Sequence, residues 1–125
     1  MNSKIFLLIT DDPDDYVEFS SALDEISSDA ILLTIANGQK AAKVLEENIF
    51  VPYCVLINIL MHEGNADQVL TTLGKGKAYS STRRVAYGGE GTEFNQLTKR
   101  EEADFLRSSL PYSELRTKLT KILEG

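Results

Sequence analysis

The sequence predicts an α/β fold in which helices cover both faces of a parallel sheet. Short apolar runs alternate with amphipathic stretches along the chain, and this alternation is typical of repeated strand–helix units. The length of 125 residues is usual for one folded unit. We therefore expect a single domain over residues 1–125.

Five apolar runs are the candidate strands. The first and third are apolar almost throughout, as strands buried on both faces should be, so we expect them at the centre of the sheet. The runs cover residues 5–9, 31–36, 53–59, 85–87 and 103–106.

Amphipathic stretches between and after these runs are the candidate helices. Their apolar residues recur at steps of three and four, which places each set along one stripe of a helix. The clearest stripes are Tyr16, Phe19, Leu23 and Ile26 in the first helix, and Leu115, Leu119 and Ile122 in the last.

Polar residues mark where the helices begin. Asp12 can cap the first helix, and the acidic residues Asp14 and Asp15 complement the positive end of its dipole. Asn37 and Asn65 are placed to open the second and third helices in the same way.

Charge and hydropathy limit the binding partners and the cellular location that we expect for the protein. The net charge of −6 argues against non-specific binding to nucleic acid, which depends on Lys and Arg. No apolar run reaches the ~18 residues of a membrane-spanning helix, and acidic residues directly follow the run 5–9. The single cysteine, Cys54, lies in an apolar run and is expected to act as a small core residue. We expect a cytoplasmic protein without a membrane segment.

Asn58 is the polar residue that says most about function. It stands near the carboxyl end of the run 53–59, and the ligands of open parallel sheets bind just outside the carboxyl ends of the strands. The lone pair of an amide nitrogen is delocalised, so Asn58 is a poor nucleophile. The neutral side chain also brings no charge for binding a divalent cation.

Four segments together resemble the receiver domain of two-component response regulators. They are residues 7–15, 37–38, 55–61 and 103–106, and their order and spacing match over the whole chain. The resemblance implies a flavodoxin-like sheet of five parallel strands in the order 2-1-3-4-5, with five helices. It also implies a stand-alone receiver-like domain, with no output domain within residues 1–125.

Receiver domains accept a phosphoryl group from a histidine kinase on an aspartate, with help from two acids that hold Mg²⁺, a hydroxyl group and a lysine. Positioning and charge neutralisation carry such a reaction, so each part is needed. The five positions fall on Thr10, Asp11, Asn58, Gly88 and Ser108.

Only Asp11 keeps the residue type that the resemblance implies. We therefore expect a degenerate phosphorylation pocket with one carboxylate and a charge of −1. It should have no catalytic residue and no metal site, and its Mg²⁺ binding should be weak or absent. The protein is not expected to be an enzyme.

Three functions remain open. The favoured one is a phosphorylation-independent protein-interaction module in signal transduction, whose partner is a protein such as a histidine kinase or another regulator. The first alternative is an active phosphorelay receiver that is phosphorylated on Asp11 or Asp12, although Asp12 suits helix capping better. The second is a small-molecule site lined by Asp11, Asn58 and Ser108.

Other positions follow from the same resemblance. Phe105 matches the aromatic switch residue of the family, and we expect it to pack inward because Gly88 offers no hydroxyl group. His62, the only histidine, is expected to be an exposed loop residue rather than a phosphohistidine or metal ligand. The candidate partner surface combines aromatic, aliphatic and cationic residues: Phe94, Leu97, Lys99, Arg100, Arg107, Tyr112 and Arg116.

Overall fold

A computed structural model describes residues 4–27, 29–59, 66–75, 77–87, 104–106 and 112–124. Its centre is a five-stranded parallel sheet in the order β2-β1-β3-β4-β5, which confirms the predicted order. The strands are β1 (Lys4–Ile9), β2 (Ala30–Ile35), β3 (Cys54–Asn58), β4 (Arg83–Tyr87) and β5 (Asp104–Leu106).

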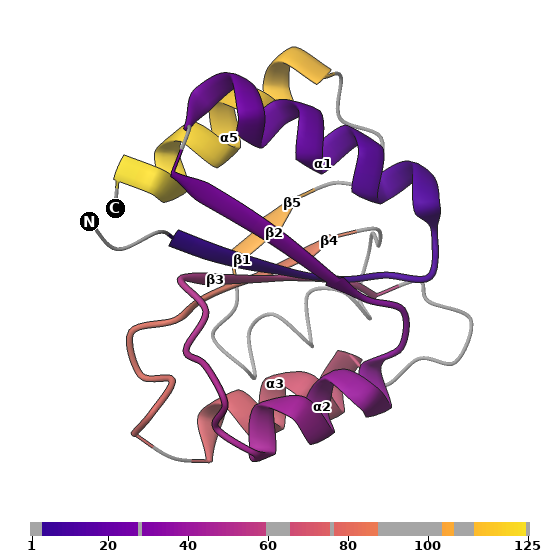
Figure 1. Ribbon diagram of the computed structural model, residues 1–125, viewed down its shortest axis with the longest axis vertical. Helices are drawn as coiled ribbons and strands as arrows, with labels where there is room; N and C mark the ends of the chain where they lie inside the picture. Colours follow the sequence, from indigo (N-terminus) through magenta and orange to yellow (C-terminus); the bar gives the residue numbers. More distant parts are fainter. Residues whose placement is uncertain are drawn as a thin grey trace.

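Helices cover both faces of this sheet, as Figure 1 shows. One face carries α1 (Pro13–Ile26) and α5 (Tyr112–Glu124), and the other carries α2 (Gly38–Glu46) and α3 (Ala66–Gly74). The additional helix expected between β4 and β5 falls outside the described residues. Among the helices described, none has the length and apolar character needed to cross a membrane.

The central strands supply most of the core. All five residues of β3 are buried, and β1 is buried from Phe6 to its end, which confirms the prediction that these two strands are central. Alternate side chains point to opposite faces of a strand. Phe6 and Leu8 accordingly pack under α1 and α5, whereas Leu7 and Ile9 pack over α2 and α3. Cys54 is buried in the first of these clusters, as expected.

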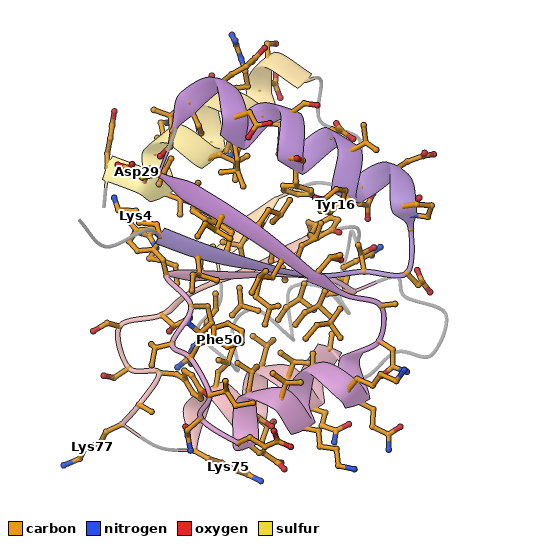
Figure 2. The ribbon with its side chains drawn as sticks, in the orientation of Figure 1. Lys4, Tyr16, Asp29, Phe50, Lys75 and Lys77 are labelled. Carbon is orange, nitrogen blue, oxygen red and sulfur yellow. The ribbon has the colours of Figure 1, made fainter. Side chains whose placement is uncertain are left out.

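The inward stripe of α1 differs by one residue from the prediction. Phe19 and Leu23 are buried as expected, but Tyr16, which is labelled in Figure 2, is 40% exposed. The residue one turn before Phe19 is Asp15, because side chains four apart share a helix face. The half-buried Asp15 therefore lies where an apolar residue was expected.

Side chains near the amino ends of the strands hold the carboxyl ends of three helices. The Tyr53 hydroxyl donates to the carbonyl of Ile122 in α5 over 2.8 Å, and Lys4 Nζ lies 4.8 Å from the centre of the Tyr53 ring. Arg84 donates to the last turn of α3, and Tyr79 donates to the last turn of α2. These bonds bring side-chain donors to carbonyls in the last turns of the helices, where the regular intrahelical bonds run out.

Candidate functional site

Three polar side chains meet at the carboxyl edge of the sheet, on the face covered by α1. Thr10 directly follows β1, Asn58 ends β3, and Tyr87 ends β4. Strand alternation places Thr10 on the same face as Phe6 and Leu8, and the β3–β4 register pairs Asn58 with Tyr87. All three side chains are at least 90% buried.

Asp15 reaches this edge from the first turn of α1. Asp12 starts the helix, because its carboxylate accepts a hydrogen bond from the backbone N–H of Asp14 over 2.9 Å. This cap confirms the predicted role of Asp12. It also fixes the phase of the helix, so that the next inward residue, Asp15, lies above the ends of the strands.

One carboxylate oxygen of Asp15 accepts three side-chain hydrogen bonds. Its Oδ2 atom lies 2.7 Å from the Tyr87 hydroxyl, 2.8 Å from Thr10 Oγ1 and 3.3 Å from Asn58 Nδ2. Three elements of the fold, namely β3, β4 and the end of β1, therefore converge on a single side chain of α1. Hydrogen bonds to a charged acceptor are stronger than neutral ones, so the carboxylate is the centre of this network.

Thr10 links the members of the network. Its hydroxyl oxygen donates to Asp15, and it accepts from Asn58 Nδ2 over 3.1 Å and from the Asp12 backbone N–H over 3.2 Å. A hydroxyl group has one proton and two lone pairs, so these bonds use its full capacity. The two protons of Asn58 Nδ2 are also both used, one on Thr10 and one on Asp15. The donors and acceptors in this arrangement match one another.

Tyr87 is held in its neutral form. Burial raises the pKa of the Tyr87 phenol well above its ordinary value near 10. The hydrogen bond to Asp15 and the charge of Asp15 act in the same direction, whereas the interaction with Thr10 opposes them. The ring packs against Phe19 with 5.2 Å between the ring centres. Tyr87 is therefore a permanent hydrogen-bond donor at neutral pH.

The structure brings together only part of the predicted pocket. Thr10 and Asn58 are in contact, and Asp11 is exposed beside them. The prediction that Asp11 is the only carboxylate of the pocket is wrong, because Asp15 supplies a second one. The sequence places Gly88 at the position of the receiver hydroxyl group. In the structure the preceding residue, Tyr87, brings a hydroxyl group to the site.

Most of the other predicted positions lie outside the described residues. In the predicted partner surface, Arg116 is exposed on α5, and its guanidinium group donates to Glu25 of α1 over 2.9 Å. Tyr112 begins α5 and Phe105 lies in β5, but the structure describes only the backbone of these two residues. The same holds for all atoms of His62, Gly88, Phe94, Leu97, Lys99, Arg100, Arg107 and Ser108.

Two functional positions, Asp15 and Tyr87, were missed from the sequence. A signal for Asp15 was present, because it lies four residues before Phe19 and so shares its helix face. Tyr87 is the last residue of an apolar run and was assigned to the strand alone. Only the register between β3 and β4 shows that its hydroxyl group can meet Asn58.

Comparison with family models and with curated proteins gives no match. No family model matches the sequence. No curated protein matches it significantly either.

Comparison by structure gives a consistent result. A signal receiver domain of a two-component histidine kinase from Clostridium thermocellum superposes with a TM-score of 0.82 at 12% identity, over 98% of each chain. The phosphorylated cyanobacterial phytochrome response regulator RcpA gives a TM-score of 0.80 at 17% identity, over 98% of this chain and 92% of that one.

A third structure, the receiver domain of a sensor histidine kinase from Pseudomonas aeruginosa with a coordinated magnesium ion, gives a TM-score of 0.78 at 13% identity. The match covers 98% of this chain and 99% of that one. These similarities extend over nearly the whole chain and agree with the strand order β2-β1-β3-β4-β5. The chain therefore has the fold of a response regulator receiver domain.

Proposed function

We propose that this protein is a receiver-like interaction module that works in signalling without being phosphorylated. The observation that carries the proposal is the Asp15 carboxylate, which accepts hydrogen bonds from Thr10, Asn58 and Tyr87. An internal anion already uses the donors at the carboxyl edge of the sheet. A phosphoryl group entering there would compete with this carboxylate for the same donors.

The residues present do not fit the Mg²⁺ ion that the receiver fold implies. Mg²⁺ prefers carboxylate and other oxygen ligands in octahedral geometry, usually with a high local negative charge. Thr10 is neutral and engaged with Asp15, and Asn58 turns its Nδ2 donor toward Thr10 and Asp15. A cation at Asp15 Oδ2 would have to displace three hydrogen-bond donors. Asp11 remains as an exposed carboxylate at the rim, which makes a weak site by itself.

The same contacts disfavour the phosphorelay alternative. Asp12 is engaged as the cap of α1, and a phosphoryl group on its carboxylate would remove the bond to the Asp14 N–H. Asp11 is exposed, and a phosphoryl group on its carboxylate would add negative charge next to Asp12, which a cation would have to neutralise. Phosphorylation at Asp12 would therefore break the helix cap, and phosphorylation at Asp11 would add charge to an acidic segment.

An NMR titration with Mg²⁺ and beryllofluoride, a mimic of the phosphoryl group, tests the proposal. We expect the amide signals of Thr10 and Asn58 to stay unchanged at millimolar Mg²⁺, and the signal of Asp11 to shift only weakly. Intact-mass measurement after incubation with a small phosphodonor should show no added phosphoryl group. A conventional receiver domain in the same mixture serves as the positive control. Saturable shifts around Asn58, or a phosphorylated mass, would contradict the proposal.

The partner in this proposal is a protein, and the predicted surface around α5 is the first region to test. Its described member, Arg116, already bonds to Glu25, so its charge is partly engaged within the molecule. Replacing Arg116 with Glu should weaken partner binding, and because it also breaks the contact with Glu25, Glu25→Gln is the matched control that breaks the contact alone. An equal loss from both changes would show that the contact with Glu25, rather than the charge of Arg116 itself, matters for binding.

A further inference from the structure

The outer strand β2 is unusual in having no charge along its length. It lies at one end of the sheet order, and residues 30–36 contain no charged residue, proline or glycine. The whole chain has a net charge of −6, so an uncharged stretch at a sheet edge stands out. Edge strands usually carry charged side chains, proline or bulges that prevent pairing with another chain.

Two large apolar side chains of β2 are exposed. Ile31 is 44% exposed and Leu33 is 41% exposed. The register pairs Leu33 with Leu7, whose side chain lies on the face of α2 and α3. On that face, Ile35 packs against the core at the carboxyl end of the strand. Ile31 and Leu33 thus form an apolar strip toward the amino end of β2.

The outward backbone groups of β2 can be identified from its bonds to β1. The N–H of Lys4 donates to the Asp29 carbonyl, and the N–H of Thr10 donates to the Ile35 carbonyl, each over 3.1 Å. In a parallel ladder the bonding residues alternate along each strand, so odd-numbered residues of β2 bond to β1. The N–H and C=O groups of Ala30, Leu32 and Thr34 consequently point toward the open edge.

We propose that this edge pairs with the same edge of a second copy of the chain, antiparallel, with the two-fold axis at Leu32. In this register Leu32 opposes the partner's Leu32, and Ala30 opposes the partner's Thr34. Each of these opposed pairs exchanges two backbone hydrogen bonds, as hydrogen-bonded pairs of antiparallel strands do. The three pairs form six bonds and use every outward group of Ala30, Leu32 and Thr34 in both chains.

The same register covers the exposed apolar strip. Ile31 faces the partner's Leu33, and Leu33 faces the partner's Ile31, in the non-hydrogen-bonded positions where side chains approach closest. The strip is thus complementary to itself, as an interface between identical subunits requires. A second copy also meets no like charge along residues 30–36, whereas a charged peptide would find no opposite charge there.

The charge on α1 gives this dimer a recognisable salt dependence. The helix carries five acidic residues and no basic residue, and it lies over β2 (Figure 1). The two-fold axis is perpendicular to the joined sheet, so both α1 helices lie on the same side of it. Their repulsion is screened by salt, and we expect the dimer to tighten as ionic strength rises.

Sedimentation equilibrium of the full chain over a range of concentrations tests the interface. Thr34→Pro removes one outward N–H that the β1 ladder does not use, and it keeps Leu33 extended. We expect this variant to keep its circular dichroism spectrum and to dimerise at least 10-fold more weakly. The matched control, Thr34→Val, keeps the N–H and should dimerise like the wild type. Monomeric wild-type protein at about 0.5 mM, or equal dimerisation of Thr34→Pro, would overturn the proposal.

Cysteine cross-linking tests the register. A mixture of Ile31→Cys and Leu33→Cys chains should form an intermolecular disulfide, because these positions oppose one another. Either variant alone should cross-link much less, and the native Cys54 is buried. Stronger linking of either single variant with itself would exclude the two-fold axis at Leu32.

Discussion

Replacing Asn58 with aspartate is the sharpest test of the site, because this change restores the residue type that phosphorylation needs. In a pocket ready for the reaction the variant would accept a phosphoryl group. Here Asn58 Nδ2 donates to Thr10 over 3.1 Å and to Asp15 over 3.3 Å. The new carboxylate would lose both donors and place an oxygen beside the Asp15 oxygen. We therefore expect N58D to destabilise the fold and to remain unphosphorylated.

The size of this effect follows from the distance. Two charges 3.3 Å apart repel by about 5 kcal/mol at an effective dielectric constant of about 20. Keeping a proton on the new carboxyl group costs less, about 4 kcal/mol at pH 7, since an ordinary aspartate has a pKa of about 3.9. The protonated group can still donate one hydrogen bond to Asp15. The cheaper route sets an upper limit of about 4 kcal/mol on the charge-dependent part of the destabilisation at pH 7.

The effect of N58D should depend on pH with a definite sign. The new carboxyl group has a higher pKa in the folded state than in the unfolded chain. The charge-dependent part of its penalty is therefore absent below pH ~3.9, grows as the pH rises from there toward the folded-state pKa, and is constant above that pKa. The limit falls from about 4 kcal/mol at pH 7 to about 1.5 kcal/mol at pH 5.

Urea denaturation of wild type, N58D and a control at pH 5 and pH 7 measures this dependence. Asn58→Leu is the control, because it removes the donors without adding a charge. It should cost about 1–3 kcal/mol at both pH values. An N58D stability within 1 kcal/mol of wild type at pH 7 would contradict a charge conflict with Asp15, and so would a deficit equal to that of the control at both pH values. Phosphorylation of N58D would refute the claim that the pocket is closed to the reaction.

Three further predictions concern the tyrosines. Tyr87→Phe keeps the ring against Phe19 and removes one donor to Asp15. The free energy of unfolding measured in urea should therefore fall by about 1–2 kcal/mol. Wild type should lose stability above pH 10. There the unfolded chain releases the proton of Tyr87, whereas the folded protein, in which burial raises the pKa of Tyr87, still keeps it. Tyr87→Phe should lack that part of the alkaline loss, and urea titrations at pH 9 and pH 11 would show whether it does. Tyr53→Phe removes the bond to the Ile122 carbonyl at a cost of about 1 kcal/mol, with faster amide exchange in the last turn of α5 as its signature. Unchanged exchange there would mean that water replaces the Tyr53 hydroxyl group.

The arrangement of the fold could be predicted well from the sequence. The apolar runs of β1 and β3 identified the buried centre of the sheet, since strands covered on both faces have no polar side. The start of α1 followed from Asp12, whose side chain caps the helix in the structure. These features depend on local patterns, which a sequence displays directly.

The site was harder to predict because it depends on contacts between distant residues. Asn58 and Thr10 are 48 positions apart, and Tyr87 and Asp15 are 72 apart. Counting the receiver residue types that the sequence lacks predicted a pocket that is not phosphorylated, but it could not show which side chains meet there. That answer required the phase of α1, which turns Asp15 inward, and the register that places Tyr87 beside Asn58.

The bonds at the amino ends of the strands have a consequence for how this fold can change over time. Lys4, Tyr53, Tyr79 and Arg84 attach the ends of three helices to the sheet far from the carboxyl edge. The attachment of those helices therefore does not depend on the residues around Asn58. Side chains at the carboxyl edge could therefore change during evolution without loosening these helices, so the fold does not depend on which chemistry that edge carries out.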